Sequence, residues 1–382
     1  MNTCRGCESS HLERVLDLGS VPAADSFPLA HEPIESGDAI HPLVMNMCRT
    51  CGLAQLAEDD TVGDEPRGME PMALRDQAEL AVSQVAQAGW LRGSTVREFG
   101  SPHGGTWIPF TRTYGLRPAR PTDATADVVL DSFGIMHEAD QKAAFAERAA
   151  ATAPEGVLLL QFHSLATIVA QSQWNALRHG HFAYYSMKSV MGLLAAAGMS
   201  AVTAWRYNLY GGTVLVAAVH GEHQADNRIR SILEAEEEWI EPSRVASLQT
   251  AADHAASGLI AWLQSEAGCG RKVYAYGAAS RAVALFYRAG VNSSMIRAVA
   301  DAAPGKKGRR MPGTNIPIIS PDQLLIASPD RVLLTVPDLL REVHGRFPQL
   351  EGRWYVDGPN LGAPPVGDDL RVASSPVRAH AD

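Results

Sequence analysis

The chain has 382 residues, which is enough for two or three domains of roughly 150 residues each. Hydrophobic residues make up 46% of it and charged residues 20%, a composition that excludes a disordered, collagen-like or coiled-coil protein. The formal charge of −9 argues against nucleic acid as a partner, because such binding requires a basic excess or a basic stripe.

No apolar run reaches the roughly 18 to 20 residues of a membrane-spanning helix. The N-terminus shows neither the basic n-region nor the apolar h-region of an export signal. We therefore expect a cytoplasmic protein with no membrane partner, and the sequence leaves its oligomeric state open.

Four of the five cysteines form two pairs of identical spacing, Cys4 with Cys7 and Cys48 with Cys51. Two intervening residues let both thiolates of a pair reach one tetrahedral ion from a single turn, and Gly6 lets that turn bend. Matched pairs in a reducing compartment favour metal binding over disulfides. The spacing predicts one structural Zn²⁺ with four sulfur ligands and no open position for chemistry.

The zinc ligands define a small first domain. A short apolar strand is expected over 53–56, and the acidic, Gly- and Pro-bearing stretch 58–71 is typical of a linker. We place the zinc-binding domain at residues 1–70.

The middle segment, residues 71–222, has the alternating pattern of an α/β domain. Apolar residues recur at helical spacing over 72–90, and the strand expected from 95 ends in a Gly-rich turn, where α/β folds bind nucleotides. Further strands and helices alternate after it, with strands over 126–131, 156–162, 202–207 and 212–219 and helices over 140–152 and 189–197. This order predicts a largely parallel sheet with helices on both faces.

A second α/β pattern follows over residues 223–362, with a flexible tail expected over 363–382. After two helices, strands are expected over 272–276, 295–301, 331–336 and 354–357. The turn Tyr276-Gly277-Ala278 could cradle a phosphate at a helix N-terminus or be a plain tight connection. Four cations between Lys306 and Arg310 suit a phosphate-bearing ligand or a solvated loop.

Several ordered motifs together resemble the sugar C-methyltransferases that methylate nucleotide-linked 4-keto-deoxysugars in antibiotic biosynthesis. The resemblance spans nearly the whole chain, and its motifs are the two cysteine pairs, Asp17-Leu18-Gly19, Pro22 to Phe27, Glu98-Phe99-Gly100-Ser101, Ala126 to Val129, His137, His181 to Ser186, Gly211-Gly212, Tyr276-Gly277-Ala278, Asp301, Pro304 to Gly308 and Pro312 to Ile318. It implies a zinc-binding domain, a Rossmann-like domain for S-adenosylmethionine and a second Rossmann-like domain. A sugar nucleotide or related keto compound would bind between them.

The methyl-donor site departs from the family pattern. The family usually has Gly-Ser-Asn-Asp-Gly at its first motif, whereas this chain has Gly100-Ser101-Pro102-His103-Gly104. Residues 106–125 leave too little room for the strand and helix expected there, so we expect a shortened methyltransferase domain with weak or unusual donor binding. The methionine end of a donor should lie near Glu98, Gly100, Ser101, Gly104 and Gly105.

The resemblance also places a catalytic base in the strip 178–186. His181 matches the family histidine that removes a proton beside the ketone, and a neutral imidazole suits this role near pH 7. We expect His179, Tyr184 and Tyr185 to orient substrate or stabilise an oxyanion.

Gly180 stands where the family has a glutamate, so another group must set the tautomer of His181. The candidates for that group are His137, Tyr207 and Asn208. The residues expected to bind substrate are Tyr207, Asn208, Tyr276 and Lys306.

Three functions remain open at this point. The first is methyl transfer from S-adenosylmethionine to a carbon beside a carbonyl. The second is a relative without the donor that uses the same proton abstraction for isomerisation, epimerisation, elimination or cyclisation. The third is a non-catalytic binding protein. The first two share enolisation chemistry at a carbonyl.

Overall fold

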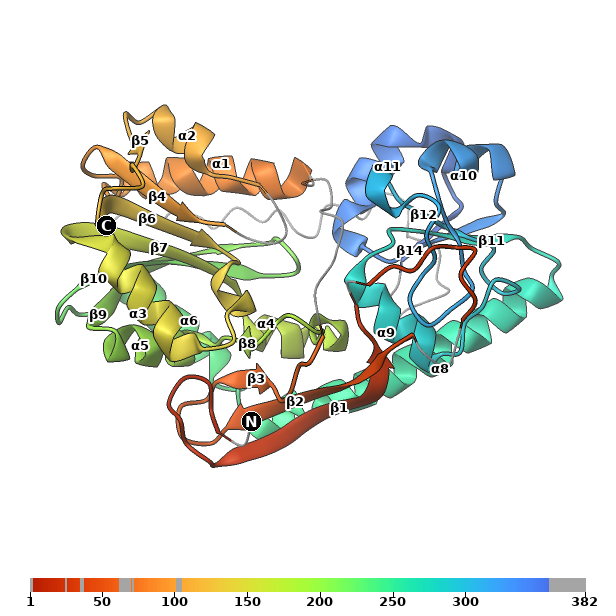
Figure 1. Cartoon of the computed structure of the whole chain (residues 1–382), viewed down its shortest axis with the longest axis horizontal. Helices are drawn as coiled ribbons and strands as arrows, with labels where there is room; N and C mark the ends of the chain where they lie inside the picture. Colours follow the sequence, from red (N-terminus) through yellow and green to blue (C-terminus); the bar gives the residue numbers. More distant parts are fainter. Residues whose placement is uncertain are drawn as a thin grey trace.

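The structure is a computed structural model that describes residues 3–24, 26–34, 38–61, 70, 72–100 and 105–356. The tail expected over 363–382 lies outside these residues. Within them the strands form three sheets of four, six and five strands (Figure 1). None of the described helices combines the length and apolar character that crossing a membrane requires.

The first sheet contains the cysteine pairs and has the order β1-β2-β3-β8. Its first three strands are antiparallel and consecutive in the chain: β1 (Leu12–Pro22), β2 (Ile40–Cys48) and β3 (Ala54–Leu56). The fourth strand, β8 (Ala183–Tyr184), comes from the middle of the chain and pairs antiparallel with β3.

The second sheet has the order β5-β4-β6-β7-β10-β9. Its first four strands are parallel, and β10 runs antiparallel between two neighbours. The strands are β4 (Thr95–Phe99), β5 (Arg117–Pro118), β6 (Ala126–Ser132), β7 (Thr152–His163), β9 (Met199–Tyr207) and β10 (Thr213–His220). The largely parallel sheet predicted for the middle segment is confirmed.

Helices cover both faces of this sheet, as Figure 1 shows. Val128 of β6 packs with Val82 of α1, whereas Val129 packs with Phe145 of α3 on the opposite face, because successive side chains of a strand point to opposite sides. One face holds α1 (Met72–Gln87) and α2 (Ile108–Arg112), and the other holds α3 (Gln141–Ala151), α5 (Met187–Ala196) and α6 (Asn227–Glu236).

The segment 106–125 corrects one expectation from the sequence. It does hold a helix and a strand, but α2 has five residues and β5 has two. Both fit because β5 is an edge strand that pairs only Arg117 and Pro118 with β4. The residues that follow β5 are Ala119 and Arg120, so no acidic side chain directly follows this strand.

The third sheet is entirely parallel, with the order β13-β12-β11-β14-β15. Its strands are β11 (Val273–Tyr276), β12 (Val299–Ala300), β13 (Ile318–Ile319), β14 (Arg331–Leu334) and β15 (Trp354–Val356). Its helices are α9 (Ser280–Arg288), α10 (Pro321–Ala327) and α11 (Leu340–Arg346). The second Rossmann-like domain predicted from the sequence is therefore present.

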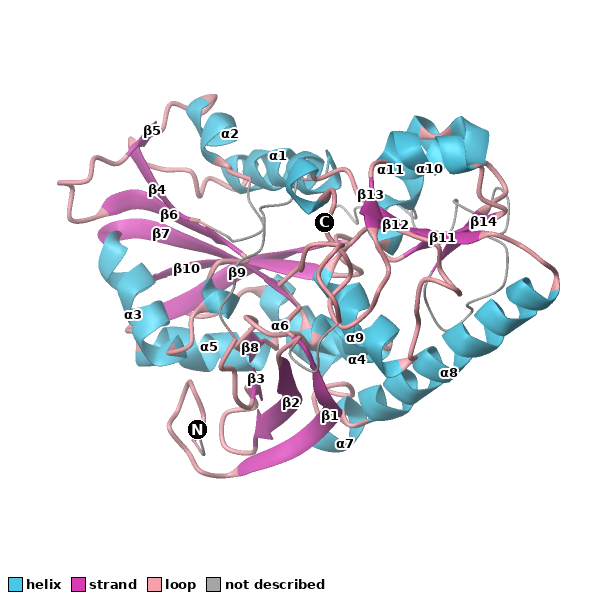
Figure 2. Ribbon diagram, turned by 45° about the vertical axis from the view of Figure 1, so that its right-hand side comes forward, coloured by secondary structure: helices cyan, strands magenta, loops and turns pink. Residues whose placement is uncertain are grey.

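The first and third sheets share one hydrophobic core. Leu16 and Val21 of β1 belong to the same buried cluster as Leu259 of the long helix α8 (Ser247–Gly268) and Val283 of α9. Helix α8 runs alongside β1 in both views (Figures 1 and 2). The shorter helices α4 (Leu165–Ala170) and α7 (Pro242–Val245) contribute Leu165 and Val245 to this cluster.

Candidate active site and zinc centre

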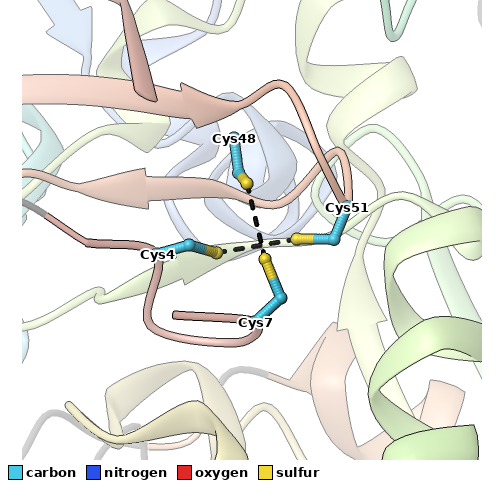
Figure 3. Close-up of side chains that lie close together, drawn as sticks. All are labelled: Cys4, Cys7, Cys48 and Cys51. Atoms are coloured by element: carbon cyan, nitrogen blue, oxygen red, sulfur yellow. Dashed lines mark hydrogen bonds between the residues drawn. The ribbon is translucent and has the colours of Figure 1, made fainter. Parts of the chain in front are cut away.

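The four paired cysteines meet at one point (Figure 3). Their sulfur atoms all lie within 4.8 Å of one another, with 3.6 Å between Cys4 and Cys51 and 3.6 Å between Cys7 and Cys48. Tetrahedral zinc with Zn–S bonds of about 2.3 Å requires sulfur atoms about 3.8 Å apart. The cluster therefore fits one Zn²⁺, and a closed four-sulfur shell gives that ion a structural role.

The geometry of the two cysteine turns explains how each pair brings both of its sulfur atoms to the same point. Gly6 donates its backbone N–H to the Cys4 sulfur at 3.4 Å, and Gly52 takes a φ of +75° while bonding the Cys48 carbonyl at 2.9 Å. A positive φ favours glycine, so the second pair depends on Gly52 to turn the chain.

His181 lies in the wall of a cavity of about 280 Å³ between the second and third sheets. It is buried, and its ring meets that of His137 edge-on, with 4.5 Å between the ring centroids. His137 Nδ1 bonds the Gly180 carbonyl at 2.8 Å, and a carbonyl only accepts, so this nitrogen holds a proton. Of the three groups expected near His181, His137 is the one found beside it.

Tyr184 lines the same cavity, but Tyr185 does not. The Tyr184 hydroxyl accepts a hydrogen bond from the Arg178 N–H at 3.2 Å, and burial raises the pKa of this phenol. Tyr185 points to the opposite side, donates to Gln141 and packs against Phe145 and Phe162. The structure thus places Tyr185 outside the cavity where its contact with substrate was expected, because neighbouring side chains of an extended strip alternate in direction.

His179 also faces away from the cavity. Its Nε2 donates to the Pro42 carbonyl at 3.3 Å, and its ring lies 5.8 Å from that of His41 on β2. Burial lowers the pKa of His179, with the nearby Asp59 acting in the opposite direction. His179 thus contacts the first sheet, and its expected place beside the substrate is not what the structure shows.

Tyr207 and Asn208 line a separate hollow beside the Gly211-Gly212 turn. The Tyr207 hydroxyl donates to Gln84 Oε1 at 2.9 Å, and burial raises its pKa. Neither residue lines the His181 cavity, where the sequence led us to expect both of them.

Tyr276 and Lys306 do line the cavity. Lys306 is buried, donates to the Ala278 carbonyl at 2.8 Å and lies 4.5 Å from the centre of the Phe27 ring. The Asp301 carboxylate accepts from the Ala278 N–H at 2.8 Å. The Ala278 N–H is therefore already bonded to a carboxylate, so it is not free to bind a phosphate at the turn Tyr276-Gly277-Ala278.

Sequence reasoning missed several polar residues of the cavity wall. Arg178, Arg281 and Arg346 lie there with His163, the last residue of β7. Arg178 Nη1 donates to the Ser280 hydroxyl at 2.6 Å and so joins the His181 strip to helix α9. Arg178 is the first residue of the predicted strip and Arg281 follows the predicted turn by three residues, so their proximity in the sequence could have identified them.

The residues expected to hold the methyl donor lie at the end of β4. Both Glu98 oxygens accept hydrogen bonds, from the Thr106 hydroxyl and from the Trp107 N–H at 2.6 Å, and burial raises the pKa of this carboxyl. Gly105 has a φ of +83° and packs on Glu70 so closely that a Cβ there would lie 2.3 Å from a carboxylate oxygen.

None of the described donor-site residues, Glu98, Gly100 and Gly105, lines the His181 cavity. Ser101 and Gly104 lie outside the described residues. On this side the cavity is lined by Glu70, Ala73, Leu74, Phe133 and Met136.

Comparison with known proteins agrees with this architecture. A family model described as "putative zinc binding domain" matches residues 4–61, and one described as "C-methyltransferase C-terminal domain" matches residues 208–356. The C-methyltransferase NovU of Streptomyces niveus is 25% identical over 367 residues, which span 85% of this chain and 86% of NovU.

Solved methyltransferase structures are also similar to part of the chain. Magnesium protoporphyrin IX methyltransferase of Synechocystis PCC 6803 with bound SAH matches with a TM-score of 0.28 and 12% identity, over 39% of this chain and 84% of that chain. The mitomycin 7-O-methyltransferase MmcR matches with a TM-score of 0.29 and 14% identity, over 40% of this chain and 59% of that chain.

The four-cysteine cluster, the three sheets and the matches together define a methyltransferase-family enzyme with a zinc-binding domain. These matches support a diverged member of the sugar C-methyltransferase family.

Proposed function

We propose that this protein methylates a carbon atom beside a carbonyl group of a small anionic substrate, with His181 as the general base. The observation that supports this most is the place of His181, buried beside His137 in the wall of a cavity between the two Rossmann-like sheets. A neutral imidazole at such a wall can take a proton from an acidic C–H group near pH 7.

The step can be written for this chain's own residues. His181 takes the proton, the C–H electron pair becomes the new carbon–carbon π bond, and the carbonyl oxygen becomes an enolate oxygen. Four basic residues of the cavity wall are suited to stabilise the enolate oxygen and any phosphate of the substrate: Arg178, Arg281, Lys306 and Arg346. The resemblance to sugar C-methyltransferases suggests a nucleotide-linked 4-keto-deoxysugar, with Tyr184 and Tyr276 beside it.

The methyl group would come from S-adenosylmethionine, which supplies an electrophilic methyl when bound. The turn that begins at Glu98 and Gly100 would hold its methionine end, because parallel β4 and β6 end together there. Gly105, with its positive φ, packs against the Glu70 carboxylate at the end of this turn. The ribose side fits less well, because Ala119 and Arg120 follow β5 where an acidic side chain would bind the ribose hydroxyls.

This weakened ribose side favours a second candidate function. A relative that no longer uses the donor would apply the same proton abstraction to isomerisation, epimerisation, elimination or cyclisation. Calorimetric titration with S-adenosylmethionine and S-adenosylhomocysteine separates the two. We expect binding weaker than micromolar if the donor is used, and none if the second function holds. Sub-micromolar binding would contradict the weakened ribose site and favour methyl transfer decisively.

Proton abstraction itself is tested by solvent exchange. A nucleotide-linked 4-keto-deoxysugar incubated with the enzyme in D₂O should gain deuterium beside its carbonyl. His181→Ala and His181→Asn should lower the exchange rate by about 10² to 10⁴-fold, and the exposed His223→Asn serves as the matched control. Exchange at the wild-type rate in both His181 variants would remove His181 as the base, and no exchange in the wild type would favour a binding protein.

A further inference from the structure

The strip that contains His181 is held by the zinc-binding sheet. Strand β8 pairs with β3, where Ala183 lies opposite Gln55 and Tyr184 opposite Ala54. The N–H of Leu56 donates to the Phe182 carbonyl at 3.2 Å, directly beside His181. The zinc-binding sheet therefore holds in place the strip that brings His181 and Tyr184 to the cavity wall.

Arg5, which lies between the ligands Cys4 and Cys7, connects the first cysteine pair to strand β3. It is buried, its N–H donates to Gln55 Oε1 at 2.8 Å and its Nε to the Leu56 carbonyl at 3.2 Å. Both acceptors belong to β3, the strand that pairs with the His181 strip.

The far end of the Arg5 side chain reaches the neighbours of both site histidines. Its Nη1 donates to the Ala139 carbonyl at 2.9 Å, two residues after His137. Its guanidinium lies 4.8 Å from the centre of the Phe182 ring, next to His181. Phe182 in turn donates its N–H to the Met136 carbonyl at 2.7 Å, so the two histidine segments are also joined directly.

We propose that Arg5 is a positioning residue that couples the four-cysteine zinc site to the His137–His181 pair. When zinc holds Cys4 and Cys7, the backbone of Arg5 is fixed and its planar guanidinium fixes the two histidine segments. When the metal is lost, the turn is released and the histidines lose this support. The function of this coupling in catalysis rests on the proposed role of His181 as base.

The contacts of the Arg5 side chain require an arginine at this position. Its rigid fork serves two carbonyl oxygens and an aromatic face at the same time, whereas a lysine ammonium is a point charge with a different reach. The carbonyls of Leu56 and Ala139 would each lose a donor in Arg5→Met, and for Leu56, which is buried, the loss of this partner is unfavourable.

The test compares full-length wild type, Arg5→Met and Arg5→Lys, with Arg14→Met as the matched control, since Arg14 is 67% exposed on β1. Zinc per chain, melting temperature and the ring NMR signals of His137 and His181 are measured with metal and after chelation. Chelation should shift both histidine signals in the wild type and in Arg14→Met. Zinc-loaded Arg5→Met and Arg5→Lys should already show the shifted signals, and chelation should then add little.

A second variant covers the case in which Arg5→Met fails to hold zinc. Phe182→Leu leaves the cysteine turn intact and removes the ring beneath the guanidinium, and it should likewise weaken the response of His181 to chelation. Equal shifts on chelation in the wild type, Arg5→Met and Phe182→Leu would overturn the proposal, as would wild-type histidine signals in zinc-loaded Arg5→Met.

The proposed function is judged separately by deuterium exchange. A displaced His181 should lower the exchange rate of Arg5→Met by about 10- to 100-fold with little change in substrate KM. If the NMR coupling is present but His181→Asn exchanges normally, the base assignment fails while the coupling stands.

Discussion

At the scale of single residues, His163 has the most distinctive environment in the cavity. Its Nε2 is buried without a hydrogen-bond partner among the residues that the structure describes. Burial lowers the pKa of His163 to about 3, and the positive charges of Arg281 and Arg178 act in the same direction. His163 is therefore neutral at any pH near 7 and can offer a hydrogen bond to substrate without a charge.

This pKa predicts how folding stability depends on pH. The unfolded chain binds a proton at this histidine below about pH 6.5, whereas the folded chain does so only near pH 3. The contribution of His163 is therefore fully present above pH 6.5 and falls as the pH drops toward 3, by up to about 1.4 kcal/mol per pH unit. When the pH is lowered from 7 to 4, the free energy of unfolding, measured by denaturant titration, should fall less in His163→Leu than in the wild type. Parallel curves for the two proteins would show that His163 titrates normally.

At the scale of elements, a buried ion pair joins β6 to α3. Arg148 Nε donates to Asp131 at 3.0 Å, and both side chains are 2% exposed or less. Asp131 also accepts from the N–H groups of Gly134 and Ile135, and so shapes the turn in which Phe133 takes a φ of +63°. Burial raises the pKa of Asp131, and Arg148 opposes this effect by stabilising the carboxylate.

Removing one partner of this pair leaves the other buried without its counter-charge. We expect Arg148→Met to lower the free energy of unfolding by about 3–5 kcal/mol, measured by urea denaturation. Arg244→Met is the control, because Arg244 is 54% exposed and its pair with Glu238 at 3.3 Å is worth under about 1 kcal/mol. Similar small losses in both variants would mean that the Arg148 pair adds nothing to stability.

At the scale of the whole molecule, the zinc centre supports more than its own turns. The sheet that holds the cysteines shares its core with α8 and α9 of the C-terminal domain. Metal binding supplies folding free energy to such small domains, so zinc loss should weaken this shared core as well.

Metal analysis should find one zinc per chain in protein never exposed to a chelator. Cys48→Ser should lower both the zinc content and the melting temperature, because it removes a buried ligand. Cys269→Ser is the matched control, since Cys269 is exposed and lies outside the cluster. Well under one zinc per wild-type chain, or an unchanged melting profile in Cys48→Ser, would contradict the assignment.

The sequence by itself determined those features that depend on local spacing. Paired cysteines two residues apart predict a metal site wherever they lie in the fold, and apolar periodicity predicts strands and helices from neighbouring residues alone. His181 was identified from its motif, and the structure places it in a cavity wall beside His137.

Only the tertiary structure decided which side chains meet. Strand β8 joins the zinc-binding sheet through a pairing with β3 that is distant in sequence, and no local pattern encodes such a partner. The direction of each side chain depends on that pairing, which turns Tyr184 into the cavity and Tyr185 away from it. His163 joins the same cavity only because β7 ends there, so its chemistry follows from the packing of the sheets rather than from any motif.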